Sequence, residues 1–239
     1  MDYKDYLAGQ TDTNFWFRAK YRLIRLLMDK NTVGRISEEP LRILSIGTGT
    51  GDDLKILSQY GDNYVTDILD EALAVVPDEF CYEKRKADAC DLPYEDGFFD
   101  VVVSFDVFEH IENDTKAVSE VHRVLKKGGK LVFSVPAGPG LFSSHDVALE
   151  HFRRYDKRMV KELMHPFPVV RLFAWNTLLY PLIALSRIKN KNKEPKVDHP
   201  RFPGFIDQLF YGLILIDNFL IKRGLSLPLG VSITGWCEK

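Results

Sequence analysis

The stretch 41–54, LRILSIGTGTGDDL, constrains the fold of this chain more than any other part of it. Four of the six residues from Leu41 to Ile46 are apolar, which predicts a buried parallel strand. The strand ends directly in three alternate glycines, Gly47, Gly49 and Gly51. Glycine tolerates positive φ and lets the backbone approach a ligand closely, and the helix expected next would present free N–H groups. The stretch therefore predicts an α/β fold with a ligand site at this turn.

The spacing of the glycines narrows the choice of ligand. A dinucleotide fingerprint requires G-x-G-x-x-G and a helix N-terminus that can bind a pyrophosphate. Here the third glycine comes one position early, and Asp52 and Asp53 stand where the diphosphate would lie. Because two carboxylates would repel a phosphate group, a cofactor with a cationic or zwitterionic end fits the turn better.

A further acidic residue, Asp67, stands at the end of the next predicted strand, 63–68. A carboxylate at this place can accept hydrogen bonds from both hydroxyls of a ribose. Nicotinamide enzymes and methyl-donor enzymes share this acid, so Asp67 predicts a nucleoside without choosing between them. The alternative is a surface aspartate that caps the following helix.

Residues 86–136 contain more motifs in sequence: KADACDLP from Lys86, GFFDVVVS from Gly97, FEHI from Phe108, and VLKKGGKLVFSVP up to Pro136. With the glycine turn, this series resembles the class I S-adenosylmethionine-dependent methyltransferases. The resemblance implies a doubly wound, mainly parallel seven-stranded sheet with an antiparallel edge strand, and S-adenosylmethionine as the cofactor. It also implies that Asp88 contacts the adenine and that the cofactor is bound by Ser45, Gly47, Thr48, Gly49, Gly51, Asp67, Ile68, Asp88, Ala89 and Phe105.

One position departs from the family pattern. The family usually has Asp or Glu two residues before the first glycine, whereas this chain has Ser45. A serine donates and accepts hydrogen bonds but carries no charge. The alternative function that follows is a pseudo-enzyme, which binds the cofactor and acts as a sensor or scaffold.

The loop after the fifth predicted strand carries the candidate acceptor chemistry. It contains His145-Asp146 and then the run HFRRY, 151–155, at the sheet edge where open α/β folds bind ligands. A similar loop occurs in a subset of small methyltransferases that is associated with cell-surface glycan and lipid pathways. We predict a general base from His145 or His151, with Asp146 as its orienter.

Other side chains complete the predicted acceptor site. Arg153 and Arg154 would form a fork for a phosphate or carboxylate, with Tyr155 beside them; alternatively, the three tie the loop to the domain. His110 and the lid residue Trp16 are expected near the site. We predict no metal at His145, Asp146 and His151, because methylation of an oxygen needs none where a base is present.

Residues 175–227 predict an insertion before the last strand, 230–237. It contains the two apolar runs WNTLLYPLIALSRI and FIDQLFYGLILIDNFL, joined by a basic linker with Lys189, Lys191, Lys193 and Lys196. Pro181, Asp207 and Asp217 interrupt the runs, so neither reaches the length of an uncharged membrane span. We predict two hydrophobic helices that pack as a cap, lie in a membrane interface through 175–223, or cover a lipidic acceptor or a second subunit in a homodimer.

Composition sets the remaining bounds. Lys+Arg 32 against Asp+Glu 34 gives a net charge of -2, which predicts no binding of nucleic acid. Three scattered cysteines, Cys81, Cys90 and Cys237, and a polar start, MDYKDYLAGQ, predict the cytoplasm, including the inner face of the membrane.

The length of 239 residues predicts one domain, 1–239. We divide it into a helical lid, 1–40, a cofactor core, 41–136, an acceptor-side loop and helix, 137–165, and a hydrophobic cap, 175–227. The predicted reaction is methyl transfer to an oxygen, in preference to nitrogen or carbon, of a small or lipid-linked glycan or isoprenoid-type acceptor. A peripheral membrane-binding module on an inert fold is a further alternative.

Overall fold

The computed structural model describes residues 14–32, 39–191, 193–195 and 202–239. The first thirteen residues of the predicted lid, its segment 33–38, and Lys196 of the predicted basic linker lie outside the described residues.

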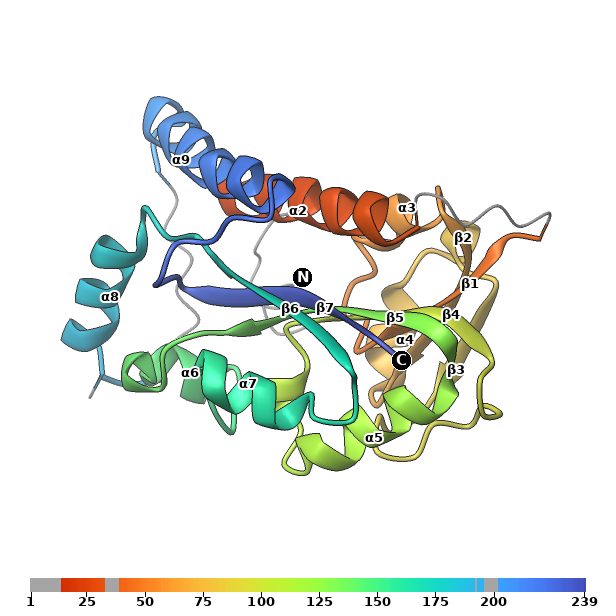
Figure 1. Cartoon of the computed structure of the whole chain (residues 1–239). Coiled ribbons are helices and arrows are strands. Elements are labelled where there is room, and N and C mark those ends of the chain that lie inside the picture. The colour runs from red at the N-terminus through yellow and green to blue at the C-terminus, as the bar shows by residue number, and fades with distance from the viewer. Residues whose placement is uncertain (1–13, 33–38, 192, 196–201) are drawn as a thin grey trace.

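One sheet organises the molecule (Figure 1). Its strand order is β3-β2-β1-β4-β5-β7-β6, with β1 to β5 parallel and β7 antiparallel to both of its neighbours. The mainly parallel, seven-stranded fold predicted from the sequence is therefore confirmed. The antiparallel strand, β7, lies between β5 and β6 and not at the edge where it was expected. The strands are β1 Leu41–Ile46, β2 Gly61–Asp67, β3 Glu83–Lys86, β4 Phe99–Phe105, β5 Leu125–Pro136, β6 Val169–Trp175 and β7 Ser232–Glu238.

Helices cover both faces of the sheet. In Figure 1, α2, α3 and α9 lie on one side and α5, α6 and α7 on the other. The helices are α2 Phe15–Thr32, α3 Leu54–Leu57, α4 Asp70–Val75, α5 Asp114–Val124, α6 Ser144–Ala148, α7 Lys157–Leu163, α8 Tyr180–Lys189 and α9 Gly204–Lys222, with short 3₁₀ turns η1 Asp78–Phe80, η2 Phe108–His110 and η3 Pro139–Leu141.

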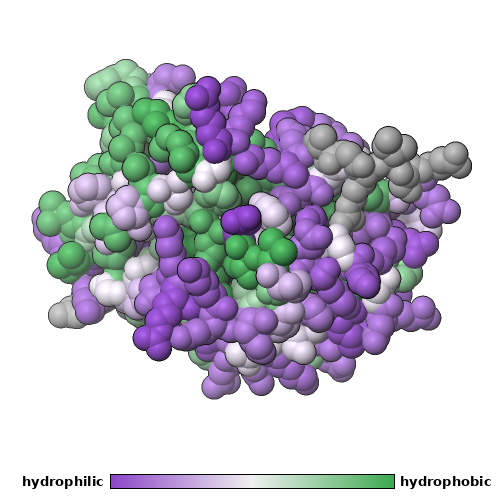
Figure 2. Space-filling model, in the orientation of Figure 1, coloured by the Kyte–Doolittle hydropathy of each residue, from purple (hydrophilic) through white to green (hydrophobic). Residues whose placement is uncertain are grey.

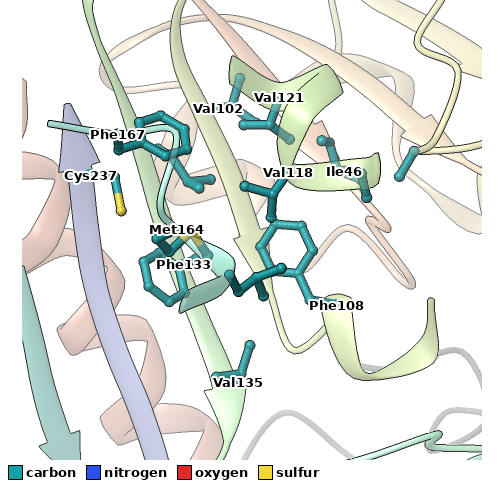
Figure 3. Close-up of a cluster of buried hydrophobic side chains, with 14 of the residues drawn as sticks. Ile46, Val102, Phe108, Val118, Val121, Phe133, Val135, Met164, Phe167 and Cys237 are labelled. Atoms are coloured by element: carbon teal, nitrogen blue, oxygen red, sulfur yellow. The ribbon is translucent and has the colours of Figure 1, made fainter. Parts of the chain in front are cut away.

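The valine run in β4 shows why this sequence forms a buried strand. Successive side chains of a strand point to opposite faces. Val102 packs in the core beneath α5 and α7, whereas Val101 and Val103 pack in the core beneath α2 and α9. Figure 3 shows the first of these cores, with Val121 beside Val102. A strand covered on both faces needs a continuous apolar run, which the sequence supplies.

The crossover helix after the glycine turn is shorter than predicted. We expected a helix from Asp52 to Gln59, but α3 covers only Leu54–Leu57. Asp52 stays in the turn and accepts a hydrogen bond from the Thr50 hydroxyl at 2.5 Å. β2 begins at Gly61, two residues before the predicted start of this strand at residue 63.

The predicted insertion contains α8 and α9, and the last strand follows as expected at β7. By length and composition, α9 is long and apolar enough to cross a membrane. Only 22% of its apolar stretch is buried inside the protein. The two aspartates that interrupt its sequence both point inward: Asp207 pairs with Arg18 of α2 at 2.6 Å, and Asp217 accepts from the Thr177 N–H at 2.7 Å. Their inward placement leaves the outer face of α9 without these charges.

Candidate active site

A cavity of about 1230 Å³ lies at the carboxyl ends of the parallel strands. Ser45 and Gly47 line it at the end of β1, Asp67 at the end of β2 and Asp106 directly after β4, and residues of α2 and α8 complete the lining. Ligands of open α/β sheets bind at this edge, because loops from neighbouring strands converge there.

The glycine turn forms one end of the cavity. Gly47 and Gly49 have φ of +61° and +55°, and a Cβ at Gly47 would lie 2.6 Å from a Val107 methyl group. Asp67 accepts hydrogen bonds from the N–H groups of Gly49 at 3.2 Å and Leu69 at 3.0 Å. These bonds fix the carboxylate at the mouth of the turn. The Thr48 hydroxyl donates to Ser45 Oγ at 3.2 Å, so Ser45 is part of the same network.

Most of the predicted cofactor residues line the cavity. Gly51 is the exception: the lining formed by the described residues does not include it, and its Cβ position faces Leu54 and Val76 at 3.1 Å. Its φ of +73° makes it a glycine that the turn requires, behind the ligand surface. The predicted residues in the lining are Ser45, Gly47, Thr48, Gly49, Asp67, Ile68, Asp88, Ala89 and Phe105.

An ion pair that the sequence analysis missed spans the middle of the cavity. Lys20 of α2 contacts Asp106 at 2.6 Å, and the Ser134 hydroxyl donates to the other Asp106 oxygen at 2.9 Å. Desolvation acts to raise the pKa of Asp106, but the Lys20 charge and these hydrogen bonds outweigh it and hold the pKa below its ordinary value. Desolvation raises the pKa of Asp53, which also lines the cavity.

The position of Asp106, directly after a predicted strand, was a usable signal. Its φ of +59° is one that non-glycine residues rarely adopt, and such strain concentrates at functional sites. Lys20 gave no signal, because a lysine on an amphipathic helix reads as part of a solvated face.

Two histidines and a carboxylate meet at the acceptor end. The rings of His110 and His151 lie edge to face with centroids 4.6 Å apart. Ligand atoms of Glu109, His110 and His151 all lie within 4.8 Å of one another, so this group could hold a metal ion. This trio differs from His145, Asp146 and His151, at which the sequence predicts no metal. A backbone bond from the Phe152 N–H to the Glu109 carbonyl at 2.8 Å joins the two segments.

Asp146 lies behind His151, fully buried, and its carboxylate accepts from His151 Nδ1 at 3.0 Å and Arg154 Nη1 at 2.8 Å. The Ser143 N–H also donates to it, at 2.9 Å, as part of the α6 capping box. Desolvation acts to raise the pKa of Asp146, but the hydrogen bond from His151 and the charge of Arg154 reverse this and hold the pKa well below its ordinary range. Since an ionised carboxylate only accepts, Nδ1 of His151 carries the hydrogen.

The arginines do not form the predicted anion fork. Arg154 is 4% exposed, and its three guanidinium nitrogens donate to Asp146 and to the carbonyls of Ala137 and Val231. Arg153 pairs with Asp114 at 2.7 Å and donates to the Glu112 carbonyl. The guanidinium groups are thus directed at protein partners, as in the alternative that they tie the loop to the domain.

The remaining predicted side chains divide between the cavity and its surroundings. Trp16 and His145 line the cavity, and Trp16 packs edge to face on Trp175 with centroids 4.8 Å apart. The lining formed by the described residues includes neither Arg153 nor Tyr155, whose hydroxyl donates to Asp114 at 2.8 Å. Arg153 and Tyr155 therefore lie outside the described lining of the cavity, where an acceptor is expected to bind.

Comparison with known proteins agrees with this architecture. Residues 44–133 match the family model described as "Methyltransferase domain". A probable S-adenosylmethionine-dependent methyltransferase of Mycolicibacterium smegmatis is 26% identical over 170 residues, covering 66% of this chain and 60% of the relative. The demethylmenaquinone methyltransferase of Deinococcus radiodurans is 32% identical over 120 residues, covering 46% of this chain and 49% of the relative.

A solved structure, a SAM-dependent methyltransferase from Archaeoglobus fulgidus, shares the fold with a TM-score of 0.54 at 17% identity, covering 94% of this chain and 99% of that one. The chain spans about half to three fifths of the length of the two curated relatives it matches. For the segment that these relatives cover, the matches support the predicted class of enzyme, an S-adenosylmethionine-dependent methyltransferase, and the predicted cofactor.

Proposed function

We propose that this protein transfers a methyl group from S-adenosylmethionine to an oxygen of an acceptor that has a polar head and an apolar tail. One observation carries the proposal: a single cavity joins the glycine turn, the histidine pair and an apolar wall. Asp67 lines the cofactor end, His151 lines the acceptor end, and Phe202 and Phe210 line the part near α9. A donor and an acceptor bound there would share one enclosed space, in which positioning supplies much of the catalysis.

The cofactor end fits a nucleoside with a cationic arm. The side chains of Ile68 and Leu69, which follow Asp67 in the chain, are 59% and 42% exposed. They place an apolar surface next to the Asp67 carboxylate, a hydrogen-bond acceptor. This combination suits an adenine attached to a ribose, with Asp88 and Ala89 at the base. Asp53, whose pKa is raised by desolvation, would gain from a nearby ammonium group. When bound, the cofactor supplies an electrophilic methyl group on a sulfonium.

At the acceptor end, His151 is the proposed base. Asp146 accepts the Nδ1 hydrogen, so the Nε2 lone pair can take the proton of an acceptor hydroxyl as its oxygen bonds to the methyl group. Arg154 keeps Asp146 ionised and in place and is therefore a positioning residue. His110, packed edge to face on His151, would limit how the acceptor oxygen approaches.

The apolar wall favours an acceptor with a hydrocarbon part. Leu182 and Ile183 of α8 line the cavity together with Phe202 and Phe210. One relative is named a demethylmenaquinone methyltransferase, so a quinone-type acceptor belongs among the candidates beside lipid-linked glycans. Peripheral membrane contact through 175–223, at the inner face of the membrane, and a homodimer form part of the same proposal.

Matched acceptors test the proposal. Formation of S-adenosylhomocysteine from S-adenosylmethionine would be measured with octyl glucoside against methyl glucoside, and with a prenylated naphthohydroquinone against the unsubstituted ring. We expect the tailed member of at least one pair to be methylated at least ten times faster. Equal rates within both pairs would contradict the proposal that the acceptor has an apolar tail.

The same assay separates two other readings of the site. Cofactor binding without turnover of any of the four acceptors would favour a pseudo-enzyme, for which Ser45 is the sequence signal. Activity that a chelator abolishes and a divalent cation restores would assign Glu109, His110 and His151 to a metal instead of a base.

A further inference from the structure

The outer faces of α8 and α9 form an apolar surface that the cavity does not use. We define the outer apolar surface as six side chains that are 45% to 76% exposed: Leu185, Ile188, Phe205, Leu209, Ile216 and Phe219. The cavity lining formed by the described residues includes none of them. Figure 2 shows hydrophobic residues gathered over α8 and α9, on a face that is otherwise mainly hydrophilic. An exposed patch of this kind marks an interaction site.

Each helix has two faces with different tasks. The residues of α8 that line the cavity are Leu182, Ile183, Ser186 and Arg187, which follow helical spacing. Leu185 and Ile188 fall on the other side of the helix. In α9 the buried stripe is Ile214, Asp217, Asn218 and Ile221, and the exposed stripe is Phe205, Leu209, Gly212, Ile216 and Phe219. Both helices thus have one face directed to the protein and one apolar face directed outward.

Polar bonds hold the inner face of α9 on the protein. Asn218 accepts from the Trp175 indole N–H at 2.8 Å and donates to the Ala19 carbonyl at 3.1 Å. Asp207 binds Arg18 and the Phe15 N–H. Moving α9 into a spanning position would leave these groups without partners in hydrocarbon, at a large cost. The helix is therefore suited to lie along a membrane surface, not to cross the membrane.

The charged side chains near the outer apolar surface indicate what binds to it. Apart from Arg187 and Lys193, which line the cavity, the described residues between 178 and 229 include four cationic side chains near the ends of α8 and α9: Lys189, Lys191, Lys222 and Arg223. Of the three acidic residues described there, Asp207 and Asp217 point inward and Glu194 lines the cavity. A second copy docked on the same patch would bring one basic rim against another. An anionic lipid surface complements both the apolar faces and their basic ends.

We propose that the outer apolar surface docks this protein on an anionic lipid bilayer, with α8 and α9 lying in the interface. Arg223, whose guanidinium lies 4.4 Å from the centre of the Phe219 ring, would be placed at head-group level. Because the opposite face of α8 is a wall of the cavity, docking would bring the cavity beside the lipid. This step rests on the peripheral membrane contact in the proposed function and deepens it, but lipid binding is measured without methyl transfer.

Vesicle sedimentation tests the proposal with the full chain. Vesicles of equal parts phosphatidylglycerol and phosphatidylcholine are compared with vesicles of phosphatidylcholine alone. We expect binding to the anionic vesicles that falls as salt is raised. Lys189→Gln with Lys191→Gln should weaken it about 30-fold, and Leu209→Ser with Phe219→Ser at least about 20-fold.

The matched control is Val75→Ser with Tyr82→Ser, two exposed apolar residues toward the β3 edge, opposite β6 in the sheet. Binding by this control should equal that of the wild type. The proposal is overturned if the wild type stays unbound on anionic vesicles, if the control loses as much affinity as the α9 variant, or if the α9 variant only changes a dimer into a monomer by sedimentation velocity. S-Adenosylhomocysteine binding, measured on each sample, reports folding and keeps a failure here distinct from a failure of the proposed function.

Discussion

The two ends of the cavity are held by contacts of different range. At the cofactor end, Asp67 is bound by Gly49 and Leu69, and the polar bonds of the turn run between adjoining strand ends. At the acceptor end, Arg154 donates to Val231 across 77 positions. Further along that side, Asn218 of α9 binds the Ala19 carbonyl across 199 positions. The cofactor end is thus built from local turns, and the acceptor end from buried clamps between distant segments. We expect substitutions to affect ligand affinity at the first and stability or turnover at the second.

The largest effect should come from Arg154→Met. The substitution leaves Asp146 buried without its guanidinium partner, which should lower the free energy of unfolding by about 3 kcal/mol. Urea denaturation measures this value. Arg153→Met is the control, because its ion pair with Asp114 is partly solvated and its loss should cost about 1 kcal/mol or less. Equal losses in the two variants would contradict a clamp at Arg154.

Turnover tests the acceptor end without perturbing the fold. His151→Gln should lower kcat about 100-fold on whichever tailed acceptor the wild type methylates, because the proposed base is lost. S-Adenosylhomocysteine affinity should stay unchanged. His165→Gln, on the short loop after α7, is the matched control and should keep full activity. A rate within a factor of two of the wild type would remove His151 as the base.

At the cofactor end, Gly47→Ala should weaken S-adenosylhomocysteine binding about tenfold, which corresponds to about 1.4 kcal/mol. Its φ of +61° and the Val107 methyl group 2.6 Å from the new Cβ both oppose the side chain. Calorimetry measures the change. Gly140→Ala should leave binding as it is, since nothing lies within 4 Å of its Cβ position. Comparable losses of affinity in both variants would contradict a specific requirement for glycine at position 47.

The smallest effect is expected at Asp217, a buried carboxylate that accepts hydrogen bonds from the Thr177 N–H and hydroxyl and has no cationic partner among the described residues. Desolvation raises its pKa, so its contribution to stability is present below the unfolded pKa of about 3.9 and is lost as pH rises through the folded pKa. At neutral pH the free energy of unfolding of the Asp217→Asn variant should therefore lie within about 1 kcal/mol of the wild-type value, or exceed it.

Asp146 should respond in the opposite sense. Its lowered pKa means that its contribution is present above the unfolded pKa and is lost as pH falls through the folded pKa. Asp146→Asn should thus destabilise the protein at neutral pH and matter less in acid. Denaturation curves at several pH values measure both aspartates, and the same pH trend for both variants would refute the distinction.

The range of the contacts also explains what the sequence could predict. The strands, the glycine turn and Asp67 follow from short patterns, because each depends on residues close together in the chain. The arrangement of the sheet was expected from the resemblance to a family. His110 and His151 were both proposed for the site, yet their edge-to-face contact depends on a backbone bond from Phe152 to Glu109. Gly51 was misplaced into the ligand surface because a glycine motif does not reveal which of its members faces inward.

Long-range pairs carried no such signal. Lys20 meets Asp106 only after α2 folds over the sheet, so neither residue was proposed. The double arginine was interpreted as an anion fork because its carbonyl and carboxylate partners lie on other segments. The aspartates of α9 read as interruptions of an apolar run, and only the packing on α2 and on residue Thr177 shows that they leave the outer face uncharged.

Calorimetric titration with S-adenosylhomocysteine tests the central claim most directly. The account predicts micromolar binding to the wild type and a loss of at least about 1 kcal/mol for Asp67→Ala, the value of a hydrogen bond to the ribose. Asp70→Ala, which removes an exposed carboxylate nearby that pairs with Lys86, should bind like the wild type. No binding to the wild type, or equal binding by Asp67→Ala, would contradict a cofactor held at the glycine turn.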